Sequence, residues 1–164
     1  REVAAAHATG GLDYVVVDYM QLLEGYGDQQ TIITDAMRKS ANAAKRYNVC
    51  WMWVSQQNEK SKDRKDPRPQ MQDCFGSNSM KQASKTMVAL FRPHEFWPNP
   101  TANHPLHGMY HKMIERMPSG QQIYENVLEL WCVKNIFGKK RSMQLLVAKP
   151  EQGILDPITT EGWL

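Results

Sequence analysis

The stretch Leu12-Asp13-Tyr14-Val15-Val16-Val17-Asp18 decides the fold class of this chain. It is a short, β-branched and nearly continuous apolar run that ends in an acid, which is the pattern of a strand buried on both faces. Strands of this kind belong to parallel sheets, in which helices cover both faces. The stretch therefore predicts an α/β fold.

A second strand of the same kind is predicted at residues 49–54, which read Val-Cys-Trp-Met-Trp-Val. Between the two strands, Asp28 can cap a helix that reaches about Tyr47 and carries Ile33 and Met37 near one face. Strand, helix and strand in this order form a βαβ unit, whose crossover is almost always right-handed.

The second half of the chain predicts further strands. Residues 86–91 are a third apolar run, expected to be a buried strand, and a short polar helix is expected before it at residues 78–85. Residues 127–134 and 142–147 alternate or run apolar on either side of Gly138, which predicts an antiparallel hairpin. We therefore expect a mostly parallel sheet with an antiparallel edge hairpin.

Two stretches read as irregular. Residues 58–73 are polar and basic, with Asp and Pro interspersed, and predict a basic, exposed and mobile loop. Residues 93–126 form a Pro/His-rich excursion that includes four of the five histidines. We expect this excursion to be irregular and to lie outside the core.

Composition sets limits on the class of protein. At 164 residues, with 41% hydrophobic and 23% charged residues, the chain suits one globular domain with its own core. The 20 Lys and Arg against 17 Asp and Glu give a net charge of +3, which permits a polyanionic partner without requiring one. Three widely spaced cysteines without a C-x-x-C pair argue against a disulfide framework or a zinc ribbon and predict a reducing compartment. The apolar runs are shorter than the roughly 20 residues that a membrane span needs, so no membrane contact is expected.

The beginning of the chain predicts a truncation. There is no initiator Met, and residues 2–8 read as the tail of a helix that Gly10 and Gly11 stop. We expect the chain to be a fragment of a larger polypeptide.

Polar side chains end the first two predicted strands. Asp18 follows the first strand, and Ser55 and Gln56 follow the second. Open α/β sheets bind ligands at the carboxyl ends of their strands, and an acid at such a position in a nucleotide-dependent motor positions Mg²⁺. The alternative is structural, with Asp18 capping a turn and Gln56 serving as an ordinary turn residue.

The chain carries an ordered set of motifs that resembles the DnaB-type hexameric helicases. The segment Val15-Val16-Val17-Asp18-Tyr19-Met20-Gln21-Leu22 resembles the Walker B segment of that family. The later motifs follow in order: Ala44-Lys45-Arg46-Tyr47-Asn48-Val49, Val54-Ser55-Gln56, Arg68-Pro69, Asp73, Ser77-Asn78-Ser79-Met80-Lys81-Gln82 and Val133-Lys134-Asn135-Ile136-Phe137-Gly138.

The resemblance implies the C-terminal half of a RecA-like ATPase core, with residues 1–164 forming a partial domain that lacks the Walker A half. It implies a replicative DNA helicase that binds ATP and Mg²⁺, assembles as a homo-hexamer, clasps single-stranded DNA and unwinds duplex DNA in the cytoplasm of a bacterial or phage-infected cell. By the same resemblance, Asp18 coordinates Mg²⁺, Gln56 senses the γ-phosphate, and Lys134 reaches a nucleotide bound by the adjacent subunit.

A DNA-facing loop is also implied. Phe75-Gly76-Ser77-Asn78 matches the loop of the family that meets DNA phosphates. Independently of the family, basic loop residues beside Gly and Ser amides suit phosphate binding without sequence preference. These basic residues are Arg64, Lys65 and Arg68.

Three features depart from the family pattern. Ile136 stands at the position of the arginine finger, and an aliphatic side chain cannot stabilise transition-state charge. Phe75 stands where the family has an arginine, and Lys81 and Lys85 replace acids. No G-x-x-x-x-G-K-[ST] occurs, so this chain alone should not hydrolyse ATP appreciably.

These departures leave several alternatives open. Cations of the predicted hairpin can replace the missing finger and contact the nucleotide, namely Lys139, Lys140 and Arg141. The chain can instead be a degenerate, non-catalytic RecA-like module for DNA binding or subunit assembly, or part of another RecA-family ATPase. A weaker alternative is a metal site built from His94, His104, His107 and His111, with Cys132 as an outside ligand.

Overall fold

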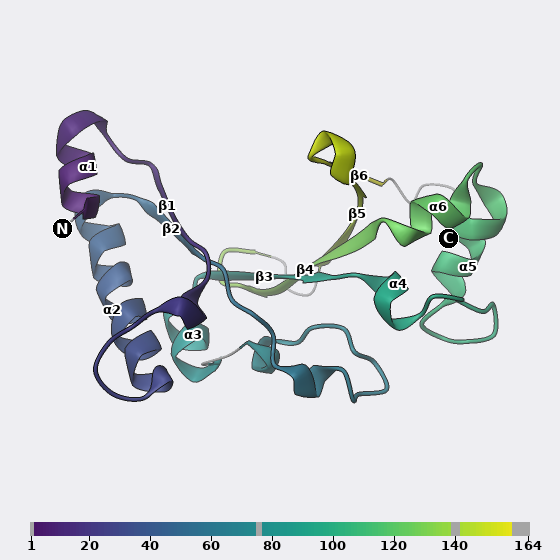
Figure 1. The fold of residues 1–164 in the computed structure, drawn as a ribbon, viewed down its shortest axis with the longest axis horizontal. Helices are drawn as coiled ribbons and strands as arrows, with labels where there is room; N and C mark the ends of the chain where they lie inside the picture. The colour runs from purple at the N-terminus through teal and green to yellow at the C-terminus, as the bar shows by residue number, and fades with distance from the viewer. Residues whose placement is uncertain (1, 75–76, 139–141, 159–164) are drawn as a thin grey trace. The chain divides into compact units, whose positions relative to one another are not determined.

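The computed structural model describes residues 2–74, 77–138 and 142–158 (Figure 1). The chain divides into two compact units. The first unit comprises residues 1–60 and 71–84, and the second comprises residues 61–70 and 85–164. None of the described helices is long and apolar enough to cross a membrane.

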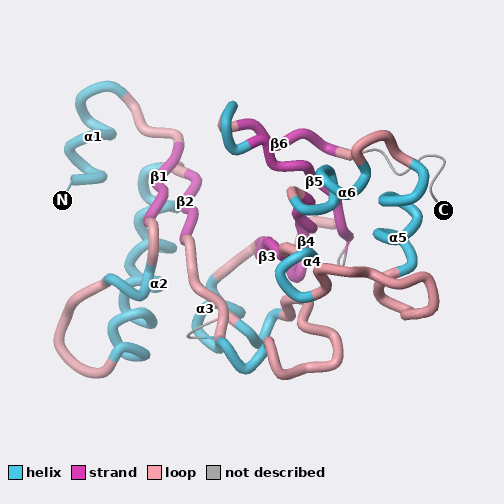
Figure 2. Tube along the Cα trace, turned by 45° about the vertical axis from the view of Figure 1, so that its right-hand side comes forward, coloured by secondary structure: helices cyan, strands magenta, loops and turns pink. Residues whose placement is uncertain are grey.

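The first unit is a βαβ unit with short helices around it. It contains α1 (Glu2–Gly10), β1 (Tyr14–Val17), η1 (Met20–Leu22), α2 (Gln29–Tyr47), β2 (Cys50–Trp53), η3 (Met71–Asp73) and α3 (Ser77–Ala83), and η2 (Glu59–Ser61) lies at its boundary with the second unit. Strands β1 and β2 pair in parallel and lie side by side in Figures 1 and 2. The Asp28 side chain caps α2 by accepting a hydrogen bond from the Thr31 N–H at 2.7 Å. The predicted βαβ unit and helix cap are confirmed.

The strands of the first unit are covered on one face only. Trp53 packs against the buried core residues, and its Nε1 donates to the Ser40 hydroxyl of α2 at 3.1 Å. The core consists of Met20, Ile33, Met37 and Met80. On the other face, Tyr14 is 68% exposed and Val16 is 59% exposed. The prediction that these strands are buried on both faces is therefore wrong, because α2 supplies cover on one side and no described element of this unit covers the other.

The second unit is built on an antiparallel sheet. Its strands are β3 (Thr86–Phe91), β4 (Val127–Asn135), β5 (Ser142–Lys149) and β6 (Ile154–Pro157), in the order β3-β4-β5-β6, and η4 (Pro150–Gln152) precedes β6. The predicted hairpin is confirmed as β4 and β5. The prediction of a mostly parallel sheet is wrong, since β3 pairs antiparallel with β4 and, among the described strands, only β1 and β2 pair in parallel. Residues of β3 alternate between exposed and buried, as they do when one face of an antiparallel sheet is covered.

The Pro/His-rich residues 93–126 supply much of the second core. They form α4 (Pro93–Phe96), α5 (Gly108–Arg116) and α6 (Gly120–Glu125). The core cluster consists of Tyr110, Met113, Tyr124, Val127 and Leu145. A Cβ on Gly120 would lie 2.6 Å from the carbonyl oxygens of Met113 and Ile114, so only glycine lets α6 begin this close to α5. The expectation of an irregular segment outside the core is therefore wrong.

Candidate functional site

The carboxyl ends of β1 and β2 bring two predicted site residues to the same edge. Pairing continues beyond the strands, because the Val54 N–H donates to the Val17 carbonyl at 2.9 Å and the Met20 N–H donates to the Val54 carbonyl at 3.0 Å. Asp18 therefore lies between two residues that bond to the second strand's end, and Gln56 follows that end directly. Parallel pairing of the strands explains this placement, because it puts both carboxyl ends at one edge.

Gln21 cross-links the two turns at this edge. Its Nε2 donates to the Ser55 hydroxyl at 3.3 Å and to the Gln56 carbonyl at 3.4 Å. Its Oε1 accepts a hydrogen bond from the Gln56 N–H at 3.4 Å. Gln29, at the start of α2, donates from Nε2 to the Gln21 carbonyl at 3.3 Å. Sequence reasoning missed Gln21 and Gln29, although Gln21 lies in the segment that also contains Asp18.

The Asp18 side chain is exposed and has no hydrogen bond or ion pair with another described residue. A carboxylate left available at a strand end suits Mg²⁺, which binds through one or two carboxylates and keeps several waters. The Ser55 hydroxyl and the Gln56 side chain add oxygen atoms at the same edge. The donor set therefore fits a magnesium-bound nucleotide.

The nucleotide-contact residues predicted in the later motifs lie in the second unit. Lys134 is a half-buried residue of β4, paired in register with Met87 of β3. Ile136 is 49% exposed just beyond β4, so its aliphatic side chain contributes no charge to the surface. The three hairpin cations Lys139, Lys140 and Arg141 lie outside the described residues.

The predicted DNA-binding residues fall into two groups. Lys65 and Asn78 are exposed, and Ser77 begins α3, while Phe75 and Gly76 lie outside the described residues. The two predicted arginines make contacts within the second unit. Arg64 donates to the Arg68 carbonyl at 2.8 Å, and Arg68 forms an ion pair with the fully buried Glu129 carboxylate at 2.8 Å.

Residues 58–73 are accordingly only partly the exposed loop that the sequence predicts. Pro67 and Pro69 are buried, and the Arg68 side chain is 16% exposed. An arginine that already pairs with a buried carboxylate is a poor candidate for a phosphate contact. The predicted contact of Arg68 with DNA would therefore compete with this ion pair.

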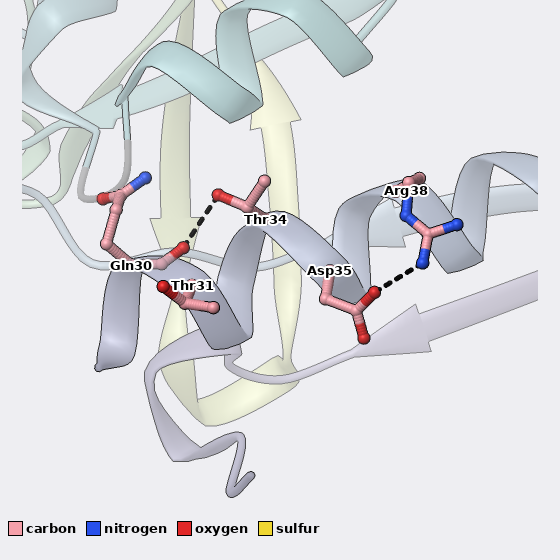
Figure 3. Close-up of a pocket in the computed structure, with 5 residues that line it drawn as sticks. All are labelled: Gln30, Thr31, Thr34, Asp35 and Arg38. Carbon is pink, nitrogen blue, oxygen red and sulfur yellow. Dashed lines mark hydrogen bonds and ion pairs between the residues drawn. The ribbon is translucent and has the colours of Figure 1, made fainter. Parts of the chain in front are cut away.

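A shallow pocket on the surface of α2 contains none of these residues. It is lined by Gln30, Thr31, Thr34, Asp35 and Arg38 (Figure 3). Arg38 pairs across it with Asp35 at 2.7 Å. The Thr34 and Ser79 hydroxyls lie 2.6 Å apart and join α2 to α3. We assign the polar groups of this pocket to helix packing and surface pairing.

The histidine-rich segment forms no metal centre in the described part of the chain, where no group of three or more His, Cys, Asp or Glu could hold an ion. His104 and His107 stack at 3.8 Å, and their Nδ1 atoms accept hydrogen bonds from the Leu106 and Thr101 N–H groups. Burial, with nearby His104 and Arg68, lowers the pKa of His107. The metal-site alternative therefore finds no support.

Comparison with known sequences identifies relatives among replicative helicases. The protein is 30% identical over 86 residues to the replicative DNA helicase DnaB of Geobacillus stearothermophilus, a match to 50% of this chain and 19% of that protein. It is 29% identical over 86 residues to the replicative DNA helicase DnaC of Bacillus subtilis, with the same two coverages. The chain thus matches about a fifth of the length of these curated relatives.

Comparison with solved structures shows the same fold. A DnaB-like replicative helicase, solved in a study of its interactions with primase, aligns with a TM-score of 0.73 at 17% identity, over 96% of this chain and 34% of that chain. A second solved structure, described as an ATPase domain, aligns with a TM-score of 0.73 at 19% identity, over 96% of this chain and 50% of that chain. The family model of the DnaB-like helicase C terminal domain matches residues 1–150. The chain therefore belongs to the DnaB-like helicase C-terminal domain family.

Proposed function

We propose that this chain forms the C-terminal half of the ATPase motor of a replicative DNA helicase, which binds single-stranded DNA and couples ATP hydrolysis to translocation and unwinding. The observation that carries the proposal is the edge at which Asp18 and Gln56 meet. Parallel pairing of β1 and β2 puts both residues there, and the Gln21 side chain bonds to the Gln56 backbone. Family membership adds support.

Each site residue has a distinct proposed role. Asp18 holds Mg²⁺, through water or directly, and the metal supplies charge neutralisation to the β- and γ-phosphates. Gln56 offers a neutral amide that can hydrogen-bond a γ-phosphate oxygen or a water without adding charge. Lys134 extends toward a nucleotide bound by the adjacent subunit of a homo-hexamer.

The phosphate-binding loop must come from outside these residues. The sequence contains no G-x-x-x-x-G-K-[ST], and the exposed apolar face of the first unit suits cover by the missing half of the ATPase domain. The members of that face are Tyr14, Val16 and Met52. The segment alone is expected to be inactive, and the complete motor works in the cytoplasm.

Proposed DNA contacts come from two stretches. Lys65 supplies an exposed cation, and the second stretch is the segment Phe75, Gly76, Ser77 and Asn78, whose backbone amides and polar residues suit phosphates. Binding of this kind is largely electrostatic and depends strongly on salt.

The test is ATP turnover by the full parent polypeptide, with and without single-stranded DNA. Asp18→Asn should lower turnover by roughly 100-fold, since it weakens binding of the Mg²⁺ that would neutralise phosphate charge in the transition state. The matched control is Asp13→Asn, an exposed acid that precedes β1 and should leave turnover unchanged. Equal turnover in wild type and Asp18→Asn would contradict the proposed role.

A second candidate function is a degenerate module that keeps the fold for DNA binding or subunit contacts. Two features favour the degenerate module: Ile136 stands at the position of the arginine finger, and the sequence contains no phosphate-binding loop. Neutralising Lys139, Lys140 and Arg141 together separates the two candidates, because these cations are the available substitutes for the finger. A parent polypeptide that hydrolyses ATP and loses this activity on neutralisation is a motor; one with no hydrolysis at all is a degenerate module.

A further inference from the structure

The chain after β2 leaves the strand pairing just before its proposed site residue. Pairing continues beyond β2 as far as Val54, whose N–H donates to the Val17 carbonyl at 2.9 Å and whose carbonyl accepts from the Met20 N–H at 3.0 Å. Ser55 and Gln56 come next, and among the described residues no backbone hydrogen bond joins either of them to the first strand or its turn. The place of Gln56 must therefore be set by other contacts.

The Gln21 side chain supplies these contacts. Its Oε1 accepts from the Gln56 N–H at 3.4 Å, and its Nε2 donates to the Gln56 carbonyl at 3.4 Å. The same Nε2 donates to the Ser55 hydroxyl at 3.3 Å, and that hydroxyl donates to the Gln56 carbonyl at 3.1 Å. One amide thus pairs with both backbone groups of Gln56, as a residue of a neighbouring strand does in a ladder.

The restraint comes from the number and arrangement of these bonds. Lengths of 3.3 and 3.4 Å exceed the usual N–H···O distance of about 2.9–3.0 Å, so each bond is weak alone. Because all three start from one planar amide, they limit the orientation of the Gln56 peptide groups as well as their distance. Gln21 is itself held, since Gln29 at the start of α2 donates to its carbonyl at 3.3 Å.

Gln21 also belongs to the segment that carries Asp18. It follows Asp18 by three residues, and Met20, which lies between them, is fully buried in the core of the first unit. Asp18 and Gln56 are both exposed, and neither side chain has a hydrogen bond or ion pair with another described residue. The Gln21 amide therefore links the segment of one proposed nucleotide-binding residue to the backbone of the other.

We propose that Gln21 is a positioning residue for the nucleotide edge, whose amide holds the Gln56 backbone beside the Asp18 segment and so sets where the Gln56 side chain meets a γ-phosphate. This inference rests on the proposed function. It gives Gln21 no contact with nucleotide of its own, so its whole effect passes through Gln56.

The test is a double-mutant cycle on nucleotide affinity in the full parent polypeptide, measured by calorimetry with Mg²⁺ present. The probes are adenylyl imidodiphosphate, a non-hydrolysable ATP analogue with a γ-phosphate, and ADP, which has none. Gln56→Ala should weaken binding of the analogue about tenfold, or roughly 1.4 kcal/mol, and leave ADP affinity unchanged. Gln21→Met, which keeps the length of the side chain without its hydrogen bonds, should do the same. The double variant should bind the analogue no more weakly than Gln56→Ala alone.

The matched control is Gln30→Met. Gln30 is an exposed glutamine of α2 whose side chain donates to Ser79 of α3, so this variant should bind both nucleotides like wild type. ADP affinity reports whether the edge is still folded. If Gln21→Met weakens both nucleotides, the decision passes to Gln21→Asn, whose amide is one methylene too short to reach Gln56. If Gln21→Asn also weakens both equally, Gln21 serves the fold of the edge and the positioning role is overturned.

Two further results would overturn the positioning role while leaving the proposed function intact. In one, Gln56→Ala loses affinity for the analogue and Gln21→Met does not. In the other, the two losses add to about 100-fold in the double variant, which would mean that Gln21 acts independently of Gln56. The proposed function itself fails if Gln56→Ala binds the analogue like wild type, or if wild type binds neither nucleotide, and the positioning role then fails with it.

Discussion

The two units differ in the side chains that build their cores. In the second unit the sheet and α5 and α6 enclose a core with two fully buried tyrosines, and the fully buried Glu129 carboxylate has several donors. In the first unit three of the four core residues are methionines, and one face of its two strands is exposed. Each unit also has one buried ring nitrogen without a partner among the described residues, Trp51 Nε1 in the first and His107 Nε2 in the second. The unit that carries the proposed nucleotide edge thus has the more adaptable core, because methionine side chains are flexible.

The largest effect is expected where the second unit buries charge. Arg68→Ala removes the ion-pair partner of Glu129 and leaves that carboxylate buried, which should cost about 3–5 kcal/mol of unfolding free energy. Arg38→Ala is the contrasting variant in the first unit, where the pair with Asp35 is exposed and its loss should be undetectable. Urea denaturation followed by circular dichroism measures both. If Arg68→Ala and Arg38→Ala lose the same unfolding free energy, the buried pair of the second unit contributes no more than the exposed pair of the first.

The two cores offer the next comparison. Met113→Ala in the second unit and Met37→Ala in the first should each cost about 2–5 kcal/mol, as truncations of buried side chains do. We expect Met113→Ala to lie nearer the upper value, because Met113 is fully buried and Met37 is 5% exposed. Urea denaturation gives the ranking, and a larger loss for Met37→Ala would mean that the first unit is the better packed.

The exposed strand face should tolerate polar substitution. Threonine at Tyr14, Val16 and Met52 retains β propensity, so each change should alter the unfolding free energy by no more than about 0.5 kcal/mol. Self-association of the isolated chain, measured by light scattering, should fall. Val15→Thr is the control, since Val15 is half-buried between two exposed neighbours. If the variant with all three threonine substitutions loses more unfolding free energy than Val15→Thr, the exposed face does not tolerate polar residues.

The smallest effect concerns two cysteines of the first unit. Burial, with the charge of Asp73, raises the pKa of Cys74, whereas Cys50 is exposed on β2. Because the thiolate is the reactive species, iodoacetamide at pH 8 should modify Cys50 faster than Cys74, with the rates converging as pH rises. Peptide mass spectrometry follows both sites. Faster modification of Cys74 would indicate that the η3 region opens readily.

Local patterns predicted much of this fold. The helical spacing of apolar residues predicted α2, and Asp28 predicted its cap. The alternation of apolar and polar residues predicted the β4–β5 hairpin. The apolar run of β3 could not reveal its direction, because a short apolar run reads the same in a parallel and an antiparallel sheet. In residues 93–126 the prolines and histidines obscured Tyr110 and Met113, which lie three residues apart on one face of α5.

Long-range pairing limited what could be predicted of the site. The positions of Asp18 and Gln56 after two paired strands could be predicted because strand ends are visible in the sequence, and their roles stay predictions. The Gln21 contacts with Gln56 depend on the β1–β2 register, and the Arg68–Glu129 pair joins residues 61 positions apart. Neither has a local signature, so the sequence alone could not show that Arg68 pairs with a buried carboxylate.

The most direct test of the central claim is the Mg²⁺ dependence of ATP turnover by the full parent polypeptide, compared between Asp18→Asn and Asp13→Asn. If the carboxyl ends of β1 and β2 form the magnesium–nucleotide edge, Asp18→Asn should need a higher Mg²⁺ concentration for half-maximal turnover and should turn over less ATP at saturation. Asp13→Asn should match wild type in both respects. If all three proteins show the same Mg²⁺ dependence and the same maximal turnover, the nucleotide site does not lie at this edge.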